Sequence, residues 1–268
     1  MSNDDLGDRM KFYESFETSR RFLPMLPVYA RIDGRGFSKF TRGMERPFDA
    51  RMTNAMIETT RYLVKETHAL AGYVQSDEIS LLWKAPDHTS SIFFDGKIAK
   101  MTSVLASMAA AAFGQEIRGW SPYDTRYPAF DARVIQLPTD YEAANMFVFR
   151  ALDAIKNSVS MAAHDKFSPS QLHKKDQRAM HEMLEEIGVD FSAFPASFRL
   201  GTFLKRVTEQ RELTEDELKA IPEKNRTTER IVTRSRIATM DWPPFRQIAN
   251  RTEVLFEDAE PIVKSSLS

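Results

Sequence analysis

Two adjacent carboxylates interrupt a stretch of otherwise strand-like residues. In the segment YVQSDEISLLW, residues 73–83, Asp77 and Glu78 separate two apolar runs that are typical of a buried β-hairpin. Burying an unpaired carboxylate costs several kcal/mol, so two of them at a strand junction indicate a compensating cation. The alternative is a solvated hairpin tip, where aspartate is common.

A third carboxylate, Asp33, ends another predicted strand. In the segment LPVYARIDGRGF, residues 26–37, aliphatic and polar residues alternate, and Asp33 belongs to the polar face. Apolar residues at helical spacing predict helices over residues 49–70 and 96–113, and a further strand is predicted over residues 129–138. The order strand, helix, hairpin, helix, strand is that of a split βαβ arrangement, an α+β fold whose antiparallel sheet carries its helices on one face.

Glycines and prolines divide the rest of the chain. Gly72 is expected to end the first of these helices. After Pro138 the pattern becomes helical, with a Ser-Pro start and a terminal glycine around one segment and a capping box in another. The helices predicted there cover residues 140–167, 168–188 and 214–221.

Composition excludes several other kinds of site. The chain has no cysteine, so disulfides, thiolate metal sites and cysteine nucleophiles are excluded. Its five histidines are scattered without a metal-ligand spacing, which argues against zinc. The polar N-terminal segment has no signal-peptide core and no apolar run approaches the ~20 residues of a membrane helix, so we expect a cytoplasmic protein without a membrane partner. Basic residues gather in residues 222–236, where they either contact phosphates or form a solvated face.

In a split βαβ sheet the first strand and the hairpin are central neighbours. Asp33 is therefore expected to face Asp77 and Glu78, and three converging carboxylates would form a site for two hard divalent cations, which prefer oxygen ligands. Two such ions, roughly 3.5–4 Å apart, stabilise the attacking and leaving oxygens of a phosphoryl displacement. In the segment DGRGFSKF, Gly34 and Gly36 are expected to turn backbone amides inward as an anion nest. Its spacing matches neither a Walker A loop nor GxGxxG.

Four segments together resemble the tRNA(His) guanylyltransferase family and its guanylyltransferase-like members. They are RIDGRGFSKF, RPFDARM, YVQSDEISLLW and YPAFDARVIQLP, and the resemblance covers about residues 10–206. Members of that family add nucleotides to the 5′ end of tRNA, the reverse of ordinary polymerisation, with a polymerase-type palm. The resemblance implies a catalytic palm domain over residues 1–138, a helical and basic C-terminal region over residues 139–268 that contacts tRNA, and a homotetramer.

The resemblance also implies a role for individual residues. Asp33 and Asp77, with the Gly34 carbonyl, would bind two Mg²⁺ ions, and Glu78 would support them as a third catalytic acid. The residues expected to bind the nucleoside triphosphate, ATP or GTP, are Asp33, Gly34, Arg35, Gly36, Phe37, Ser38, Arg46, Ser76, Lys97 and Lys100. RNA contacts are expected at Arg133, Arg150 and Asn157 and, from the basic segment, at Arg230, Arg234 and Arg236. The sequence departs from the family pattern at Arg46, where lysine is usual, and at Ala132, where glycine is usual.

The implied reaction needs no protein nucleophile. ATP first adenylylates a 5′-monophosphate and pyrophosphate leaves; the 3′-hydroxyl of an incoming nucleoside triphosphate then attacks and AMP leaves. With a 5′-triphosphate, pyrophosphate leaves instead. Both are in-line transfers in which positioning and charge neutralisation do most of the catalysis.

One helix distinguishes two branches of the family. The eukaryotic enzymes carry R-x-x-D followed closely by HINN, which is associated with adding one G without a template. Here Arg150, Asp153 and Asn157 match, whereas Ile155 and Ser158 replace the histidine and the second asparagine. Because isoleucine has no donor or acceptor, we predict a template-dependent enzyme that repairs 5′-truncated tRNAs. A tRNA(His)-specific enzyme that adds a single G is the alternative.

Two functions of other classes also fit a palm. A nucleotide cyclase uses paired acids in the same kind of sheet, but the long C-terminal region argues against it. A non-catalytic RNA-binding protein would keep the fold alone, and the intact set of Asp33, Asp77 and Glu78 argues against that, because unused clustered acids are unfavourable.

Overall fold

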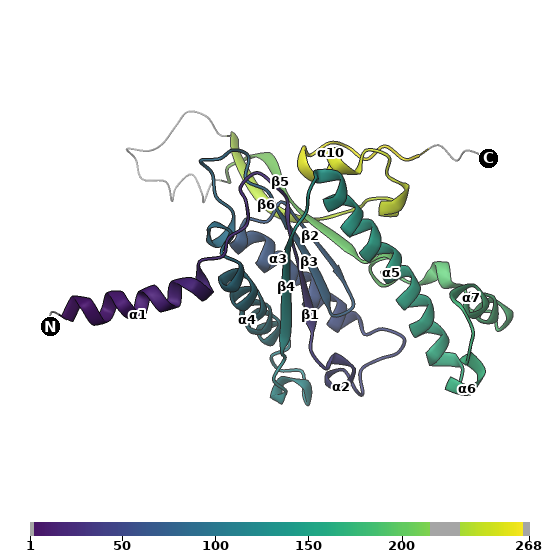
Figure 1. Cartoon of the computed structure of the whole chain (residues 1–268). Coiled ribbons are helices and arrows are strands. Elements are labelled where there is room, and N and C mark those ends of the chain that lie inside the picture. The colour runs from purple at the N-terminus through teal and green to yellow at the C-terminus, as the bar shows by residue number, and fades with distance from the viewer. Residues whose placement is uncertain (1–2, 215–230, 265–268) are drawn as a thin grey trace.

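The computed structural model describes residues 3–214 and 231–264, and it combines helices with one antiparallel sheet (Figure 1). Within those residues the sheet has the strand order β4-β1-β3-β2-β5-β6. The strands are β1 Val28–Gly34, β2 Ala71–Gln75, β3 Glu78–Trp83, β4 Phe130–Gln136, β5 Thr202–Glu212 and β6 Ile231–Met240. The α-helices are α1 Asn3–Thr18, α2 Phe37–Phe40, α3 Ala50–Thr67, α4 Ile98–Glu116, α5 Asp140–Lys166, α6 Pro169–Leu172, α7 Gln177–Glu186, α8 Ala196–Leu200 and α10 Arg251–Phe256. None of the helices in these ranges combines the length and apolar character needed to span a bilayer.

The first half of the chain has the predicted order of strand, helix, hairpin, helix and strand. β1 lies between β3 and β4 and pairs with both in the antiparallel direction. This register places Asp33 opposite Glu78 of β3 and opposite Asp131 of β4. The predicted α+β fold is confirmed, and its acidic residues lie at one end of the sheet.

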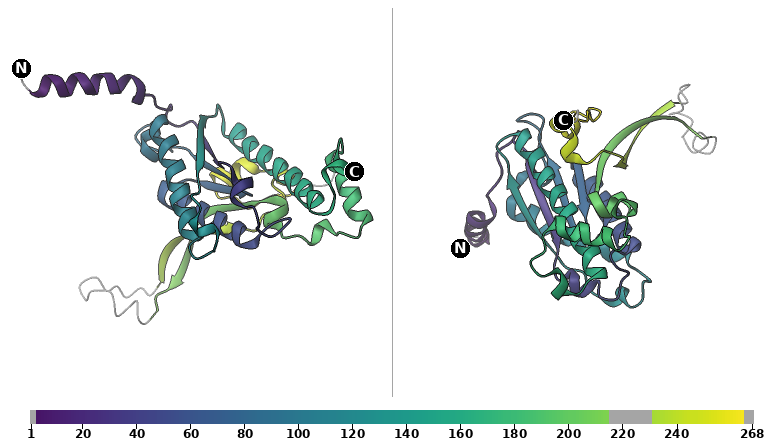
Figure 2. Two further views of the ribbon diagram at one scale, coloured as in Figure 1. Left: turned by 90° about the horizontal axis from the view of Figure 1, so that it is seen from below. Right: turned by 90° about the vertical axis from the view of Figure 1, so that its right-hand side faces the viewer.

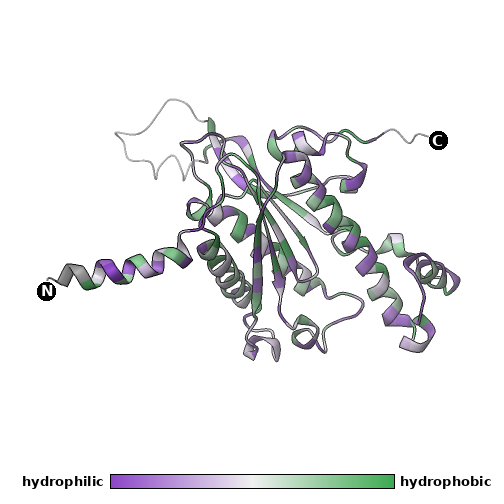
Figure 3. Cartoon of the chain, viewed as in Figure 1, coloured by the Kyte–Doolittle hydropathy of each residue, from purple (hydrophilic) through white to green (hydrophobic). Residues whose placement is uncertain are grey.

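Helices cover both faces of this sheet (Figures 1 and 2). Because side chains alternate along β1, Val28 and Ile32 join the core beneath α3 and α4, whereas Tyr29 joins the core beneath α5. The two helices predicted for one face are therefore α3 and α4, and the C-terminal region supplies the cover of the other face. Hydrophobic residues accordingly predominate along the central strands (Figure 3).

The region after residue 138 is less helical than its sequence pattern predicted. β5 and β6 continue the sheet beyond β2, and much of their length forms a ribbon that projects from the molecule (Figure 2). The sequence pattern did not predict β5, because the part of this strand in the ribbon lies outside the core and lacks an alternation of apolar and polar residues. The helix expected over residues 168–188 is divided, since Lys174 has a left-handed φ of 59° and Asp176 caps the new helix α7. The helix expected over residues 214–221 lies outside the described residues from position 215 onward.

A buried lysine holds the C-terminal helix against the sheet. Lys205 of β5 is 4% exposed, and its Nζ donates to the carbonyls of Val254 and Leu255 at 2.7 and 3.1 Å. The same Nζ lies 2.5 Å from the Asp258 carboxylate. These are the last carbonyls of α10, which have no partner within the helix itself, so the lysine satisfies them and fixes α10 in place.

Helix α3 ends earlier than the sequence indicated, and its glycine has another function. His68, with φ of 54°, ends the helix, and Gly72 lies inside β2. A Cβ at Gly72 would lie 2.6 Å from the Val64 side chain and 2.9 Å from that of Thr60. The glycine is therefore required by the close approach of α3 to the sheet.

We predict that Gly72→Ala lowers the free energy of unfolding by about 1–3 kcal/mol, because the added methyl group forces α3 away from β2. Urea unfolding followed by circular dichroism measures the effect. The matched control is Gly7→Ala in α1, where a Cβ would meet no atom within 4 Å, and which should leave stability unchanged or raise it. Equal midpoints for Gly72→Ala and the wild type would contradict this packing.

Candidate active site

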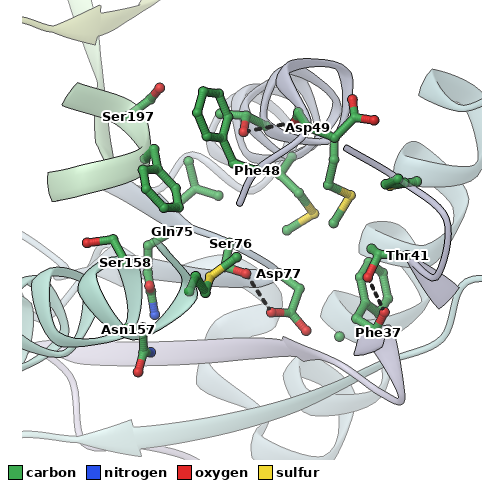
Figure 4. Close-up of a pocket in the computed structure, with 18 of the residues that line it drawn as sticks. Phe37, Thr41, Phe48, Asp49, Gln75, Ser76, Asp77, Asn157, Ser158 and Ser197 are labelled. Atoms are coloured by element: carbon green, nitrogen blue, oxygen red, sulfur yellow. Dashed lines mark hydrogen bonds between the residues drawn. The ribbon is translucent and has the colours of Figure 1, made fainter. Parts of the chain in front are cut away.

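Two of the predicted acidic residues meet where β1 ends and the β2–β3 hairpin turns. The turn consists of Ser76 and Asp77, and Ser76 has a left-handed φ of 50°. The Gly34 amide donates to the Asp77 carbonyl at 3.1 Å, which fixes the end of β1 beside the turn. Ser76 Oγ lies 3.1 Å from Asp77 Oδ1 and orients that carboxylate (Figure 4). Asp33 and Asp77, distant in the sequence, are thereby brought to the same end of the sheet.

These residues line one side of a cavity of about 520 Å³ (Figure 4). The loop between α2 and α3 and the first turns of α3 form another side, and α5 and α8 contribute the remaining wall. The volume lies within the range of about 300–1,000 Å³ typical of small-molecule sites. The residues expected to bind nucleotide that line it are Asp33, Gly34, Gly36, Phe37, Ser38, Arg46 and Ser76.

The two aspartates provide a donor set for a hard cation. Burial raises the pKa of Asp77, and the negative charge of Asp33 raises it further. A cation between the two carboxylates would relieve both effects. Mg²⁺ is usually bound through one or two carboxylates together with phosphates of its substrate, so Asp33, Asp77 and the Gly34 carbonyl fit it.

The third carboxylate does not join them. Both oxygens of Glu78 accept hydrogen bonds from Arg150, at 2.6 Å from Nε and 2.5 Å from Nη2. Burial raises the pKa of Glu78, and the hydrogen bonds from Arg150 oppose that rise. In the described part of the chain no group of three or more His, Cys, Asp or Glu side chains is placed to hold a metal. The expected convergence of three carboxylates is wrong because Glu78 is already paired with a cation of the protein.

The anion nest predicted from Gly34 and Gly36 is wrong for Gly34, whose amide already has an acceptor within the protein. The amides of Gly34 and Arg35 donate to the carbonyls of Asp77 and Ala129, at 3.1 and 2.8 Å. Both amides hold the turn to its neighbours and are not available to a phosphate. The Arg35 side chain is exposed and lies outside the cavity lining.

Gly34 is required because no space is left for a side chain, and Gly36 is favoured because its backbone has a left-handed conformation. A Cβ at Gly34 would lie 2.4 Å from the Phe37 ring, which is buried beneath it. Gly36 has a left-handed φ of 70° and begins α2. Among the described residues the first amides of α2, those of Phe37 and Ser38, have no backbone acceptor. They remain available to an anion in the cavity.

Two lysines expected at the triphosphate lie toward the other end of the sheet. Lys97 caps α4, and Lys100 lies in its first turn with Nζ 4.9 Å from the centre of the Phe94 ring. The opposite end of α4 approaches the cavity, because Phe113 packs on Phe37 with 5.4 Å between ring centres. The stretch from Lys100 to Phe113 corresponds to about 20 Å along a helix. Neither lysine reaches the cavity within this chain.

Helix α5 carries two of the residues expected to contact RNA, in different settings. Asn157 lines the cavity (Figure 4). Arg150 is 6% exposed and paired with Glu78 inside the protein. The expectation that Arg150 contacts RNA is therefore corrected, because its guanidinium is buried and engaged.

Of the other expected RNA contacts, those that the structure describes lie on the surface, Arg133 at one edge of the sheet and Arg234 and Arg236 at the other. Arg133 belongs to the edge strand β4, with 61% of its side chain exposed. Arg234 and Arg236 lie on the projecting ribbon, where Arg236 Nε is 2.9 Å from a carboxylate oxygen of Glu209. Arg230 lies outside the described residues. The basic segment is thus presented on an exposed ribbon in the part that the structure describes.

The sequence analysis did not single out the aromatic residues of the cavity. Phe48, from the loop before α3, stacks on Phe198 of α8 with ring centres 4.9 Å and planes 24° apart. Both line the cavity, together with Met52, Met56 and Met161. Phe48 and Phe198 are far apart in the chain, and no sequence pattern connects them; only the segment RPFDARM drew attention to Phe48.

One aspartate fixes the loop that borders the cavity. Asp49 caps α3 by accepting from the Arg51 amide at 2.9 Å and from the Arg51 guanidinium at 3.1 and 2.7 Å. It also accepts from the Glu45 amide at 3.3 Å, and so holds the loop that carries Arg46. The hydrogen bonds from Arg51 lower the pKa of Asp49 to about 2.

Comparison with known proteins gives consistent matches. A sequence model described as "Thg1: tRNAHis guanylyltransferase" matches residues 8–138. The chain is similar to a solved structure of a bacterial tRNA(His) guanylyltransferase (Thg1)-like protein in complex with ATP, with 35% identity and a TM-score of 0.70 over 75% of this chain and 87% of that one. A structure of such a bacterial protein in complex with GTP has 29% identity and a TM-score of 0.69 over 90% of this chain and 94% of that one. A probable tRNA(His) guanylyltransferase of Drosophila melanogaster is 26% identical over 74% of this chain and 73% of that protein.

The lowered pKa of Asp49 predicts a pH-dependent contribution to stability. Asparagine still caps a helix but has no negative charge to form an ion pair with Arg51. Asp49→Asn should therefore lower the free energy of unfolding at pH 7 by about 1–2 kcal/mol. Because the folded pKa is below the unfolded value of 3.8, the difference from wild type should be full above about pH 5, smaller at pH 3, smaller again at pH 2 and absent only near pH 1. Urea unfolding across this range measures it. A difference that stays constant from pH 7 to pH 3 would show that Asp49 acts without its charge.

Proposed function

Because this chain belongs to the tRNA(His) guanylyltransferase family, we propose that it is a template-dependent 3′-to-5′ nucleotidyltransferase that restores missing nucleotides at the 5′ end of tRNA. Nucleotidyl transfer is the activity of the family, and the direction, the template and the truncated substrate are the parts we propose. The 5′ end would react as a triphosphate or as a monophosphate activated with ATP. GTP or another nucleoside triphosphate would supply the added nucleotide.

The observation that carries this proposal is the position of Asp33 and Asp77 at the wall of a nucleotide-sized cavity. One end of the cavity is acidic and polar, and its other walls include aromatic rings and methionines. A nucleoside triphosphate has the same division, with a charged phosphate chain at one end and a flat base at the other. The bacterial relatives in complex with ATP and with GTP support such a ligand.

At the acidic end the residues would bind and orient the phosphates. Asp33, Asp77 and the Gly34 carbonyl would hold the two Mg²⁺ ions, which supply charge neutralisation at the attacking and leaving oxygens when bound. The hydrogen bond from Ser76 keeps the Asp77 carboxylate turned toward the cavity. The amides of Phe37 and Ser38 in α2 and the side chain of Arg46, which line the cavity, would receive phosphate oxygens. A nucleotide hydroxyl attacks, so no protein nucleophile is required.

At the apolar end the stacked rings of Phe48 and Phe198 would support the base. Stacking on aromatic side chains is sequence-tolerant, because every base presents a π-face. Such a wall suits an enzyme that takes its choice of base from a template strand. Addition of a single G to tRNA(His) would instead require groups that read guanine.

The environment of Ile155 favours templated repair over single-G addition. Ile155 stands where the family's histidine is usual, and it lies outside the cavity in a shallow depression with Leu200 and Phe245. An isoleucine side chain cannot reproduce the hydrogen bonds of a histidine. The tRNA itself would approach from the open side of the cavity, with the ribbon residues Arg234 and Arg236 as further contacts.

We predict that Asp33→Ala and Asp77→Ala each abolish nucleotide addition while the protein stays folded. Either change removes a metal ligand, and it also relieves repulsion between the two carboxylates, so the melting temperature should be unchanged or slightly higher. Incorporation of labelled GTP into tRNA in the presence of ATP and Mg²⁺, combined with thermal melts, tests both statements. Asp87→Ala, in an exposed turn beyond the other end of β3, is the matched control and should retain activity. Near-normal turnover in either site variant would overturn the two-metal assignment.

A comparison of two substrates tests the proposed specificity. A tRNA lacking its G at the first paired position should be extended faster than full-length tRNA(His) bearing A at the discriminator position, because only the truncated tRNA offers a template base. The rates are measured side by side with the same labelled GTP. Faster addition to the full-length tRNA(His) would establish single-G addition as the function. If the protein bound tRNA in EDTA but incorporated no labelled GTP in the presence of Mg²⁺, its function would be RNA binding without catalysis.

A further inference from the structure

The geometry points to Arg150 as a positioning residue of the proposed transfer site, acting through Glu78. Arg150 keeps the Glu78 carboxylate away from the metal ligands and holds the α5 wall of the cavity at a fixed place relative to Asp33 and Asp77. This inference rests on the proposed function, because it states how that same site is held in its working geometry.

The contacts of Arg150 commit its guanidinium to the protein interior. Nε and Nη2 donate to the two oxygens of Glu78 at 2.6 and 2.5 Å, a bidentate pair in which both residues are 6% exposed. Nη2 also lies 3.1 Å from Asp153 Oδ2 on the next turn of α5. The side chain is nearly buried and its Nε and Nη2 are engaged, which argues against a direct contact with RNA.

The Glu78–Arg150 pair connects the end of the sheet that carries Asp33 and Asp77 to the α5 wall of the cavity, and these two parts must keep a fixed relative position. Glu78 follows Asp77 directly in the chain and lies opposite Asp33 in the antiparallel register of β1 and β3. Arg150 lies one turn before the part of α5 that lines the cavity, which includes Ala154 and Asn157. A rigid bidentate contact therefore links the metal-binding end of the sheet to the opposite wall of the cavity.

The charge of Arg150 also determines which carboxylates are free to bind the cation. With Glu78 neutralised, the repulsion among the acidic residues at the strand ends is smaller, and Asp33 and Asp77 can stand close together. Arg31 Nε, 3.8 Å from Glu78 Oε2, adds a second positive charge on the same side. Glu78 thus acts as the anchor for Arg150 and lies outside the set of metal ligands.

Replacing the whole pair tests the inference without leaving a buried charge. The double variant Glu78→Leu/Arg150→Met should fold, because apolar residues of similar volume commonly replace a buried ion pair without loss of stability. Its affinity for Mn²⁺, titrated by electron paramagnetic resonance in the presence of a non-hydrolysable ATP analogue, should be weaker by about 10- to 100-fold, as for other partners that orient metal ligands. The matched control is Glu182→Leu/Arg178→Met, an exposed pair on α7, which should bind Mn²⁺ as the wild type does.

A single substitution distinguishes an anchor from a ligand. Glu78→Gln still accepts a hydrogen bond from Arg150 and should lose much less Mn²⁺ affinity than Asp77→Asn, which removes a ligand charge. Equal losses in these two variants would make Glu78 a ligand and overturn the inference. The Glu78→Leu/Arg150→Met variant should also bind tRNA with the wild-type affinity and salt dependence. A weaker dependence of tRNA affinity on salt concentration in this variant would show that Arg150 does contact RNA.

The Mn²⁺ titration does not depend on catalysis, so it separates the two proposals. If the wild-type protein bound Mn²⁺ with the ATP analogue but added no nucleotide to tRNA, the proposed function would fail and the positioning role of Arg150 would still be measured. If the folded Glu78→Leu/Arg150→Met variant bound Mn²⁺ as tightly as the wild type, the pair would be only structural and the inference would fail, whatever the tRNA activity.

Discussion

The arrangement at one end of the sheet depends on how the charge of Glu78 is balanced. The antiparallel register brings Asp33, Asp77 and Glu78 to neighbouring strand ends, and three negative charges there, that of Glu78 buried, would repel one another. Arg150 of α5 neutralises Glu78 and donates two short hydrogen bonds to its carboxylate. What remains is a pair of carboxylates at a cavity wall, which is the donor set that a nucleotide-bound Mg²⁺ requires.

The cavity exists because elements from both faces of the sheet meet beyond the strand ends. α3 packs so closely on β2 that only glycine fits at position 72, and Asp49 fixes its first turn and the preceding loop. α5 lies on the opposite face and contributes its own wall through Asn157. The cavity is thus enclosed by elements from both layers of helices.

The elements of the palm were predictable because their signals are local. Alternation marked β1, helical spacing marked α3, α4 and α5, and the pair Asp77–Glu78 marked the hairpin turn. The predictions that were wrong concern groups whose surroundings come from elsewhere in the chain. Gly34 suggested an anion nest, yet its amide is taken by a carbonyl of the neighbouring turn. Lys100 was expected at the triphosphate from the family resemblance, yet the length of α4 places it far from the cavity.

The sequence by itself determined the α+β fold and the two aspartates at one end of the sheet, because the periods of strands and helices and the order of elements leave few arrangements open. Only the tertiary structure decided that Glu78 is paired with Arg150, that Phe48 stacks on Phe198, and that β5 extends the sheet. Each of these depends on contacts between residues far apart in the chain. Such contacts leave no periodic trace in the sequence, because either partner alone has the pattern of an ordinary surface or core residue.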